Sequence, residues 1–505
     1  MEEKTTMSKA YEQLQMYLER AQAFQTAMVL FEWDNETLAP KEAGAYTSKM
    51  IGAISGEYFR VITDEEFKRL VKECKQDDSL SEVESAIVRE AAEELEQLEC
   101  IPAKEYRAFA ELCSESTRIW AKAKKDKDFQ VFAPTLKKVL DYQKRFASYR
   151  AKEGQKLYDV MLDTYEKGFD METLDKFFGM LKEQLVPFLK KLTDSGISID
   201  DCFLTGDYPE EKQEEIGRYL AEYVGFDFDK GVMAVSAHPF TTNLHNHDVR
   251  ITTAYNDHVD DSIFSVIHES GHGIYEMGIP DEMTQTLIGQ GTSMGMHESQ
   301  SRFFENIIGR SKAFWEPVYG KLQKIFPEQL GKVSLEQFVA AVNKVTPSLI
   351  RTQADELTYS LHVLIRYEIE KMLIEEDLDV EKLSEVWSDK YEEYLGVRPK
   401  NVSEGVLQDI HWSQGSFGYF PSYALGSAFG AQFYAYMKKH MDFEGLLKKG
   451  REGITVIREF LRQNIHQYGK LKTSRQILKD VTGEDFDPQY YVDYLIQKYS
   501  GIYGI

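Results

Sequence analysis

Apolar residues recur every three or four positions along most of the chain, which is the spacing of one face of an α-helix. Four stretches show this pattern most clearly, at residues 8–33, 79–98, 170–192 and 334–345. Each begins with a Ser or an Asp, whose side chains commonly cap the N-terminus of a helix. The pattern therefore predicts a mainly α-helical protein.

One segment departs from this spacing. Residues 248–255, DVRITTAY, are rich in Val, Ile, Thr and Tyr, which favours a short β-strand. Proline is scarce, with 13 residues in all, and we find no Gly/Ser-rich linker, internal repeat or low-complexity tract in the sequence. We therefore expect residues 1–505 to form a single domain, two helical lobes around a central groove with a small β-sheet.

The composition narrows the class of protein. Of the 505 residues, 42% are hydrophobic and 29% are charged, as in soluble globular proteins. The net charge of −24 argues against nucleic acid and membrane partners, because both need a basic surface. The four cysteines lack paired spacing, and the longest early apolar run, residues 27–31, is too short to cross a bilayer. We expect a cytoplasmic protein.

Histidines gather in one part of the sequence, where seven of the 11 fall between His238 and His297. Two of them, His268 and His272, are four residues apart in the segment HESGHG. Capping residues at 260–262 and the pair Gly278 and Pro280 predict a helix around this segment. Helix positions four apart share one face, so both imidazoles can reach one metal ion.

Three other residues of this helix have a chemical or steric meaning. Glu269 completes the pattern H-E-x-x-H of zinc peptidases, in which the glutamate acts as general base on a water. Gly271 costs roughly 1 kcal/mol relative to alanine inside a helix, so we expect a substrate or a neighbouring helix to approach closely there. Glu276, one turn beyond the second histidine, suits a role behind the metal ligands.

A catalytic zinc needs a third protein ligand and an open position for water. One straight helix face cannot surround an ion, so this ligand should come from another element. Residues 291–308 predict a second helix that ends near residue 309. Within it Glu298 is modestly favoured as the ligand, with His297 as the competing choice and Glu305 as a weaker one.

Several segments resemble the metallocarboxypeptidases of the carboxypeptidase Taq type, often called thermostable carboxypeptidases. The segment WDNETLAP, residues 33–40, is similar to the family's N-terminal region, although Lys41 and Glu42 stand where the family more often has a second proline and a glycine run. The stronger resemblance comes from five segments in order, DVRIT (248–252), HESGH (268–272), HESQ (297–300), IRTQADELTY (350–359) and GVLQDIHW (405–412).

This resemblance implies a nearly all-helical saddle with a deep active-site groove, as in angiotensin-converting enzyme and neurolysin, with the small sheet near the metal. It implies one divalent metal per chain, held by His268, His272 and Glu298, with Glu269 as the base. It also implies a homodimer that removes single residues from the C-termini of peptides with broad specificity. Zinc is the expected metal, and cobalt and manganese also suit two histidines and a glutamate.

An exopeptidase must hold the terminal carboxylate of its substrate, and arginine binds a carboxylate through two parallel hydrogen bonds. Arg250 and Arg351 each lie in one of the family segments, and we expect both to bind substrate. The alternative for each is a structural ion pair, which for Arg351 would involve Asp355 or Glu356, one turn away.

Peptide hydrolysis also needs a hydrogen-bond donor for the oxyanion besides the metal. His411, Tyr419 and Tyr423 are the candidates, because they lie in or just after the last family segment. The alternative is that the tyrosines are core aromatics with satisfied hydroxyls. Asp409 would either orient His411 or be structural.

Three further histidines, His238, His245 and His247, precede the metal motif. We expect them to line the groove, and a second metal site is the less favoured alternative. Two rival functions remain at this point. One is an endopeptidase or dipeptidyl peptidase with the same metal centre, and the other is a non-catalytic helical scaffold with a structural metal.

Overall fold

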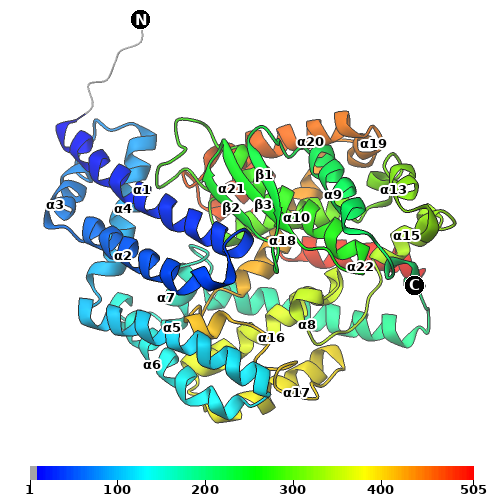
Figure 1. Ribbon diagram of the computed structural model, residues 1–505, viewed down its shortest axis with the longest axis horizontal. Helices are drawn as coiled ribbons and strands as arrows, with labels where there is room; N and C mark the ends of the chain where they lie inside the picture. The colour runs from blue at the N-terminus through cyan, green and yellow to red at the C-terminus, as the bar shows by residue number, and fades with distance from the viewer. Residues whose placement is uncertain (1–7) are drawn as a thin grey trace, which may run out of the picture.

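The structure, a computed structural model, describes residues 8–505. Within these residues the chain consists mainly of α-helices, accompanied by one three-stranded sheet (Figure 1). The mainly helical fold predicted from the hydrophobic spacing is therefore confirmed. None of the helices in this range is both long and apolar enough to span a membrane.

The helices follow one another in four runs. The first run comprises α1 (Lys9–Thr37), α2 (Gly44–Ile62), α3 (Glu65–Cys74) and α4 (Glu82–Glu99). The second comprises α5 (Ala103–Asp126), α6 (Ala133–Arg150), α7 (Leu157–Asp163), α8 (Met171–Asp194) and α9 (Glu210–Val224). The third comprises α10 (Val259–Met277), α11 (Met294–Arg302), α12 (Lys312–Trp315), α13 (Tyr319–Ile325), α14 (Pro327–Leu330) and α15 (Leu335–Val342). The last comprises α16 (Glu356–Glu375), α17 (Leu383–Leu395), α18 (Pro421–His440), α19 (Phe443–Lys448), α20 (Arg451–Asn464), α21 (Ser474–Thr482) and α22 (Gln489–Tyr503).

Three of the four predicted helix starts are the observed N-caps, and the helix predicted to start at Ser79 is capped by Ser81. Ser8, Ser81, Asp170 and Ser334 each accept a hydrogen bond from the backbone N–H three residues further on. The two serines at 81 and 334 form full capping boxes, in which the third helical residue bonds back to the cap. The observed ends differ from the predicted ones by a few residues, as expected where helix ends fray.

The start of α10 differs from the prediction. The residue before the helix is His258, whose side chain makes no capping hydrogen bond. Asp260, Asp261 and Ser262, the predicted capping residues, lie inside the first turn instead. The two carboxylates still stabilise the helix start, because negative charge near a helix N-terminus interacts favourably with the helix dipole.

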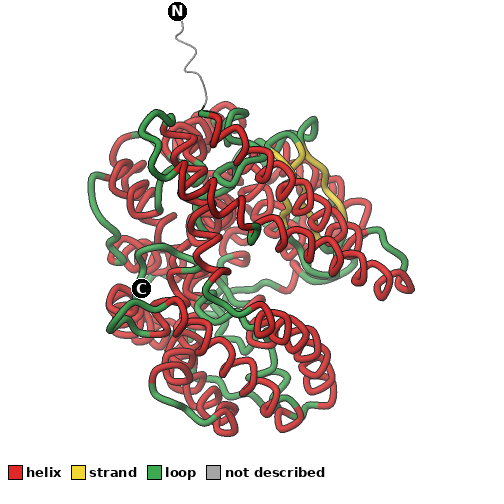
Figure 2. The backbone as a smooth tube through the Cα atoms, turned by 90° about the vertical axis from the view of Figure 1, so that its left-hand side faces the viewer, coloured by secondary structure: helices red, strands yellow, loops and turns green. Residues whose placement is uncertain are grey.

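The first four helices form a group with a hydrophobic core of their own, which includes Leu14, Leu70 and Leu95. This group, in blue in Figure 1, lies on one side of the molecule. Trp33 near the end of α1 contacts Phe240 edge-on, with 5.6 Å between ring centroids, and so connects the group to the sheet. Figure 2 shows the helices of the molecule in an upper and a lower group joined along one side, with the sheet in the upper group.

The sheet consists of β1 (Gly231–Val235), β2 (Thr241–His245) and β3 (Asp248–Thr253), in the order β1-β3-β2. β1 pairs with β3 in parallel, and β2 pairs with β3 antiparallel. The predicted strand at 248–255 is thus confirmed as β3, while β1 and β2 were not predicted. β2 is an edge strand, and the sheet packs against α10, which carries the metal motif.

Candidate metal centre

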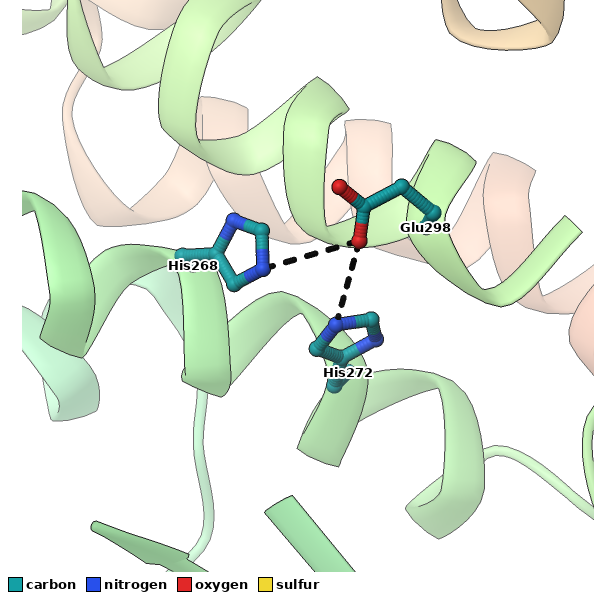
Figure 3. A group of neighbouring side chains, drawn as sticks. All are labelled: His268, His272 and Glu298. Atoms are coloured by element: carbon teal, nitrogen blue, oxygen red, sulfur yellow. Dashed lines mark ion pairs between the residues drawn. The ribbon is translucent and has the colours of Figure 1, made fainter. Parts of the chain in front are cut away.

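Three of the predicted site residues lie together between α10 and α11. Figure 3 shows His268 and His272 on one face of α10, with Glu298 of α11 facing both imidazoles. The Glu298 Oε2 atom lies 3.7 Å from His268 Nε2 and 3.6 Å from His272 Nε2. A tetrahedral zinc with bonds of about 2 Å places its ligand atoms roughly 3.3 Å apart. The three side chains therefore have the spacing of ligands that share one cation.

Two glycines allow α11 to approach closely enough for this geometry. A Cβ atom added at Gly271 of α10 would lie 2.8 Å from the Cα atom of Ser301. One added at Gly426 of α18 would lie 2.6 Å from the Cβ atom of Glu298. Both distances are too short for real Cβ atoms, so α11 fits only because both positions lack one. The close approach expected at Gly271 is thus made by a neighbouring helix.

His268 is oriented by a carboxylate behind the cluster. Its Nδ1 atom lies 2.9 Å from Glu305 Oε2, and Arg302 Nη1 donates to the same oxygen at 3.1 Å. Glu305 belongs to a π-helix, Phe303–Gly309, that continues directly from α11. Metal-binding histidines commonly donate their second ring N–H to a carboxylate in this way. Glu305 therefore contacts the imidazole nitrogen that faces away from the cluster.

His272 is oriented by a second chain of contacts. Its Nδ1 atom lies 2.6 Å from His297 Nδ1, and His297 Nε2 lies 2.6 Å from Glu276 Oε1. A consistent proton arrangement has His272 Nδ1–H donate to His297 and His297 Nε2–H donate to Glu276. His297, the competing ligand candidate, thus uses both ring nitrogens here. Glu276 lies behind the ligands, as the sequence predicted.

Buried charges set the protonation of the cluster. Burial opposes the charge on Glu298, but Arg302 and the two histidines outweigh it and hold the pKa of Glu298 well below its usual range. The Arg302 Nε atom donates to Glu298 Oε1 at 2.8 Å. Burial lowers the pKa of His272 to about 3, which favours the neutral imidazole that a metal requires. Burial opposes the charge on His268, but Glu298 and Glu305 raise its pKa. Once His268 releases that proton on metal binding, two imidazoles and one ionised carboxylate fit a divalent cation.

Glu269 lies beside the three candidate ligands without belonging to their cluster. It is buried, and its Oε2 atom accepts a hydrogen bond of 2.6 Å from the Thr241 hydroxyl of β2. Burial raises the pKa of Glu269, although His268 and this hydrogen bond oppose the shift. A carboxylate with a raised pKa can both accept and return a proton near neutral pH.

A cavity of about 1640 Å³ opens beside the cluster. Its wall includes Glu269 and the three candidate ligands, together with Thr241, Thr242 and Asn243 of the edge strand β2. More carboxylates than cationic side chains line it. A cavity of this size can hold several residues of an extended peptide.

The two candidate arginines have different surroundings. Arg351 lines the cavity, is 6% exposed, and donates from Nε and Nη2 to Asp409 Oδ1 at 3.1 and 2.9 Å. Its ion-pair partner is therefore Asp409 and not the neighbouring acids considered from the sequence. Arg250 does not line the cavity, and its Nε and Nη2 atoms both donate to Asp248 at 2.8 Å.

The candidate oxyanion donors lie near Arg351. Tyr419 and Tyr423 line the cavity, and the Arg351 guanidinium lies 4.7 Å from the ring centre of Tyr423. His411 lies behind the cavity wall, with Nε2 at 3.2 Å from the Tyr423 hydroxyl. Burial and Arg351 lower the pKa of His411 to about 4, so its ring is neutral. Asp409 bonds to Arg351 and Arg366, and forms no hydrogen bond to His411.

The remaining predicted positions divide between the cavity and the surface. His238 lines the cavity, whereas His245 and His247 do not. His247 lies 3.0 Å from Asp281 instead, and in residues 8–505 these histidines belong to no second metal cluster. Thr241 was not predicted from the sequence, because only the sheet brings its hydroxyl to Glu269.

Arg302 was also missed, although its position offered a signal. It follows Glu298 by four residues, the spacing at which a helix brings opposite charges together. In the structure it contacts both Glu298 and Glu305.

Comparison with known proteins matches this chain to the Carboxypeptidase Taq (M32) metallopeptidase family over residues 13–499. Carboxypeptidase 1 of Bacillus subtilis is 41% identical over 489 residues, which cover 96% of this chain and 97% of that protein. Thermostable carboxypeptidase 1 of Pyrococcus furiosus is 36% identical and is covered over its whole length, with 98% of this chain. The crystal structure of the M32 carboxypeptidase from Deinococcus radiodurans superposes with a TM-score of 0.95 at 33% identity, over 99% of this chain and 100% of that one.

Proposed function

We propose, from the premise that this chain belongs to the carboxypeptidase Taq (M32) family of metallopeptidases, that His268, His272 and Glu298 hold one divalent cation beside the general base Glu269. Membership of this family makes the chain a metal-dependent carboxypeptidase that acts on peptides. The observation that carries the proposed site is the convergence of two imidazole nitrogens and one carboxylate oxygen next to a buried glutamate.

Different side chains of this protein serve different steps of peptide hydrolysis. When bound, the cation supplies Lewis acidity, which polarises the scissile carbonyl and makes a water more acidic. Thr241 occupies Oε2 of Glu269, so Oε1 remains available to accept a proton from the attacking water. Glu269 then returns this proton to the leaving amine. Its fixed orientation against β2 keeps both transfers within reach of one carboxylate.

Tyr423 is the better placed of the two tyrosines to donate to the developing oxyanion. Its hydroxyl contacts His411 Nε2 at 3.2 Å. If His411 donates in this contact, the hydroxyl proton of Tyr423 is directed elsewhere and can serve the substrate. The Tyr419 hydroxyl instead contacts the weakly accepting Met294 sulfur at 3.9 Å, which orients it less strongly than a histidine nitrogen does. His411 acts on the reaction through Tyr423.

Arg351 is the better supported candidate for binding the terminal carboxylate. It lines the cavity beside Tyr423, whereas Arg250 lies outside the lining and is held by Asp248. Asp409 accepts from Nε and Nη2 of Arg351, and the Tyr359 hydroxyl accepts from Nη1 at 3.3 Å. A guanidinium has five N–H groups, so those not used in these contacts can bind a substrate carboxylate. A carboxylate bound there would limit cleavage to the last peptide bond.

The native metal is proposed to be zinc, because the imidazole and carboxylate donors suit it, although cobalt and manganese also fit. A homodimer in the cytoplasm is proposed as well. The four cysteines are free thiols in the structure, which agrees with a reducing compartment. Metal analysis of the purified enzyme and sedimentation velocity test the first two proposals directly.

The decisive experiment is mass spectrometry of one model peptide with a free C-terminus and the same peptide amidated. We expect a ladder of single losses from the free peptide, abolished by chelator and restored by metal, and no products from the amide. Internal fragments from both peptides would contradict the carboxylate-binding role and indicate an endopeptidase. Activity that persists in chelator would contradict the metal site.

A further inference from the structure

One cation in the cavity wall differs from all the others. The wall contains eight lysine and arginine side chains, and seven of them lie within 4.0 Å of a carboxylate. Lys470 is the exception. Within residues 8–505 its ammonium group has neither an ion-pair partner nor a hydrogen-bond acceptor, although its backbone is well held.

The backbone of Lys470 is fixed by the two loops that meet there. Its N–H donates to the Ile288 carbonyl at 3.1 Å, and its own carbonyl accepts from Arg89 Nη2 at 3.1 Å. Gly469 before it has a positive φ of 43°, and a Cβ atom there would lie 2.3 Å from the same Ile288 carbonyl. The backbone of Lys470 is therefore held in place, whereas the ammonium group at the end of its side chain has no partner within residues 8–505.

The surroundings of Lys470 favour contact with an anion. Burial lowers the pKa of Lys470, while the acids Glu90, Glu94 and Glu276 oppose the shift without forming an ion pair. A charge held in a poorly solvated place gains more from an opposite charge than one on the open surface. In a cavity wall where carboxylates outnumber cations, Lys470 is the described cation that no carboxylate of the protein pairs with.

The edge strand shows which part of a peptide would reach Lys470. Thr241 contacts Glu269, and Asn243, two residues later on β2, contacts Glu276. β2 therefore runs from the proposed base toward the C-terminal end of α10. An extended peptide can add to such an edge as an antiparallel strand. Its residues on the N-terminal side of the scissile bond would then lie toward Asn243 and Glu276.

Lys470 also lies near the C-terminal end of α10. Glu276 accepts a hydrogen bond of 3.0 Å from the N–H of Gly291, and Gly291 lies in the loop whose Ile288 carbonyl holds Lys470. We propose that Lys470 binds an acidic side chain on the N-terminal side of the scissile bond, so that the enzyme favours peptides with Asp or Glu there. This inference rests on the proposed function, since it needs a peptide in the cavity.

The test uses peptides that share one neutral C-terminal residue and carry Glu, Gln or Lys in turn at each of the three positions before the scissile bond. Release of the C-terminal residue by metal-loaded enzyme is measured as kcat/KM. At one of these positions we expect wild type to prefer Glu over Gln by about tenfold and Glu over Lys by more. The preference should shrink as salt rises. No preference at any position would overturn the proposal.

The variants separate a binding role from a structural one. Lys470→Met should remove the preference for Glu while the rate on the Gln peptide stays within about threefold. The charge reversal Lys470→Glu should reverse the preference in favour of the Lys peptide. Lys472→Met is the matched control, because Lys472 also lines the cavity but is paired with Asp480 at 2.8 Å. It should keep the preference of wild type.

The opposing outcomes are distinct. If Lys470→Met slows all peptides equally, or if Lys472→Met removes the preference as well, Lys470 is not the specificity residue. If wild type itself releases no single C-terminal residue from any peptide, the proposed function fails first. Equal preferences in wild type and Lys470→Met, with normal release of the C-terminal residue, would overturn the Lys470 proposal alone.

Discussion

The polar groups on two walls of the cavity are arranged differently. On the metal wall, formed by α10, α11 and the π-helix, Glu305 holds His268, His297 holds His272, and Arg302 holds Glu298. On the tyrosine wall, formed by His411–Gln414 and the start of α18, the buried Ser422 hydroxyl and the Nδ1 atom of His411 have no hydrogen-bond partner within residues 8–505. The unpaired buried atoms of α10, Ser270 Oγ and Asp260 Oδ1, belong to residues outside the candidate ligand cluster.

This contrast suggests a division of roles. Groups that must keep one geometry throughout the reaction are fixed by their neighbours, which avoids reorganisation during catalysis. Groups near the bound peptide keep unpaired polar atoms, because a fully paired hydroxyl would have to break a bond before it could bind substrate. The comparison predicts that changes on the two walls affect different measurable quantities.

The largest effect is expected on the metal wall, from Glu269→Gln. Glutamine cannot accept a proton from water, so kcat should fall by about 10³- to 10⁴-fold. The amide can still bond to Thr241, and the three candidate ligands are untouched, so metal content measured by mass spectrometry should remain that of wild type. A variant with full metal and a rate within tenfold of wild type would contradict the base assignment.

The next largest effect is expected on the tyrosine wall, from Tyr423→Phe. The ring and its contact with Arg351 are kept and only the hydroxyl is lost, so kcat should fall by about 10²-fold with metal affinity unchanged. Tyr419→Phe is the matched control and should have a smaller effect, because the Met294 sulfur orients that hydroxyl only weakly. Equal rates for wild type and both variants would remove the tyrosines from the mechanism.

A smaller effect, on metal affinity, is expected from Glu305→Gln. Loss of the carboxylate behind His268 should weaken metal binding by about 10- to 100-fold, which competition with a chromophoric chelator can measure. Glu276→Gln provides the comparison, because it acts on His272 only through His297 and should weaken binding less. Unchanged affinity in both variants would show that these contacts do not support the metal wall.

Glu166→Gln, at the edge of the metal wall, is expected to affect catalysis least. Its expected effect is on the pH dependence of stability. Burial raises the pKa of Glu166 from 4.5 to about 7, against hydrogen bonds from Ser474, Ser293 and Gly295. The folded protein then binds a proton that the unfolded chain has lost between these values, so wild-type stability decreases as pH rises from about 4.5 to 7. This single group contributes up to about 3 kcal/mol to that decrease.

Glu166→Gln should remove this contribution and flatten the pH dependence. The free energy of unfolding, measured by denaturant titration at several pH values from 5 to 8, checks the slope. The control Glu183→Gln changes an exposed glutamate of α8 and should leave the wild-type slope intact. Parallel pH profiles for wild type and Glu166→Gln would contradict the burial argument.

The parts of the site that the sequence predicted are those determined by local geometry. His268, Glu269 and His272 follow from helical spacing alone, and Ser8 or Ser334 mark helix starts by a contact three residues away. Glu298 was only modestly favoured over His297, because the choice depends on how closely two helices approach. That approach is set by glycines in α10 and α18, far apart in the sequence.

Contacts between residues far apart in the sequence could not be predicted from local spacing. Asp409 pairs with Arg351 across 58 residues, and only the folded chain shows that the nearer acids are used elsewhere. The mainly helical fold was predictable because amphipathic spacing recurs in many segments. The strands β1 and β2 could not be predicted, because each has only five residues and these alternate too little between apolar and polar positions to indicate a strand.

The π-helix after α11 makes the geometry of this region sensitive to the deletion of a single residue. A π-helical turn is equivalent to an α-helix that has accepted an extra residue. Deleting one residue between 303 and 309 would restore ordinary α-helical winding and leave the flanking segments in place, but it would shift residues inside the stretch by one position, about 100° around the helix axis. Glu305 would then face another direction, even though the three candidate metal ligands remain in the chain. Sequence length in this short stretch is therefore as much a part of the metal site as the identity of its side chains.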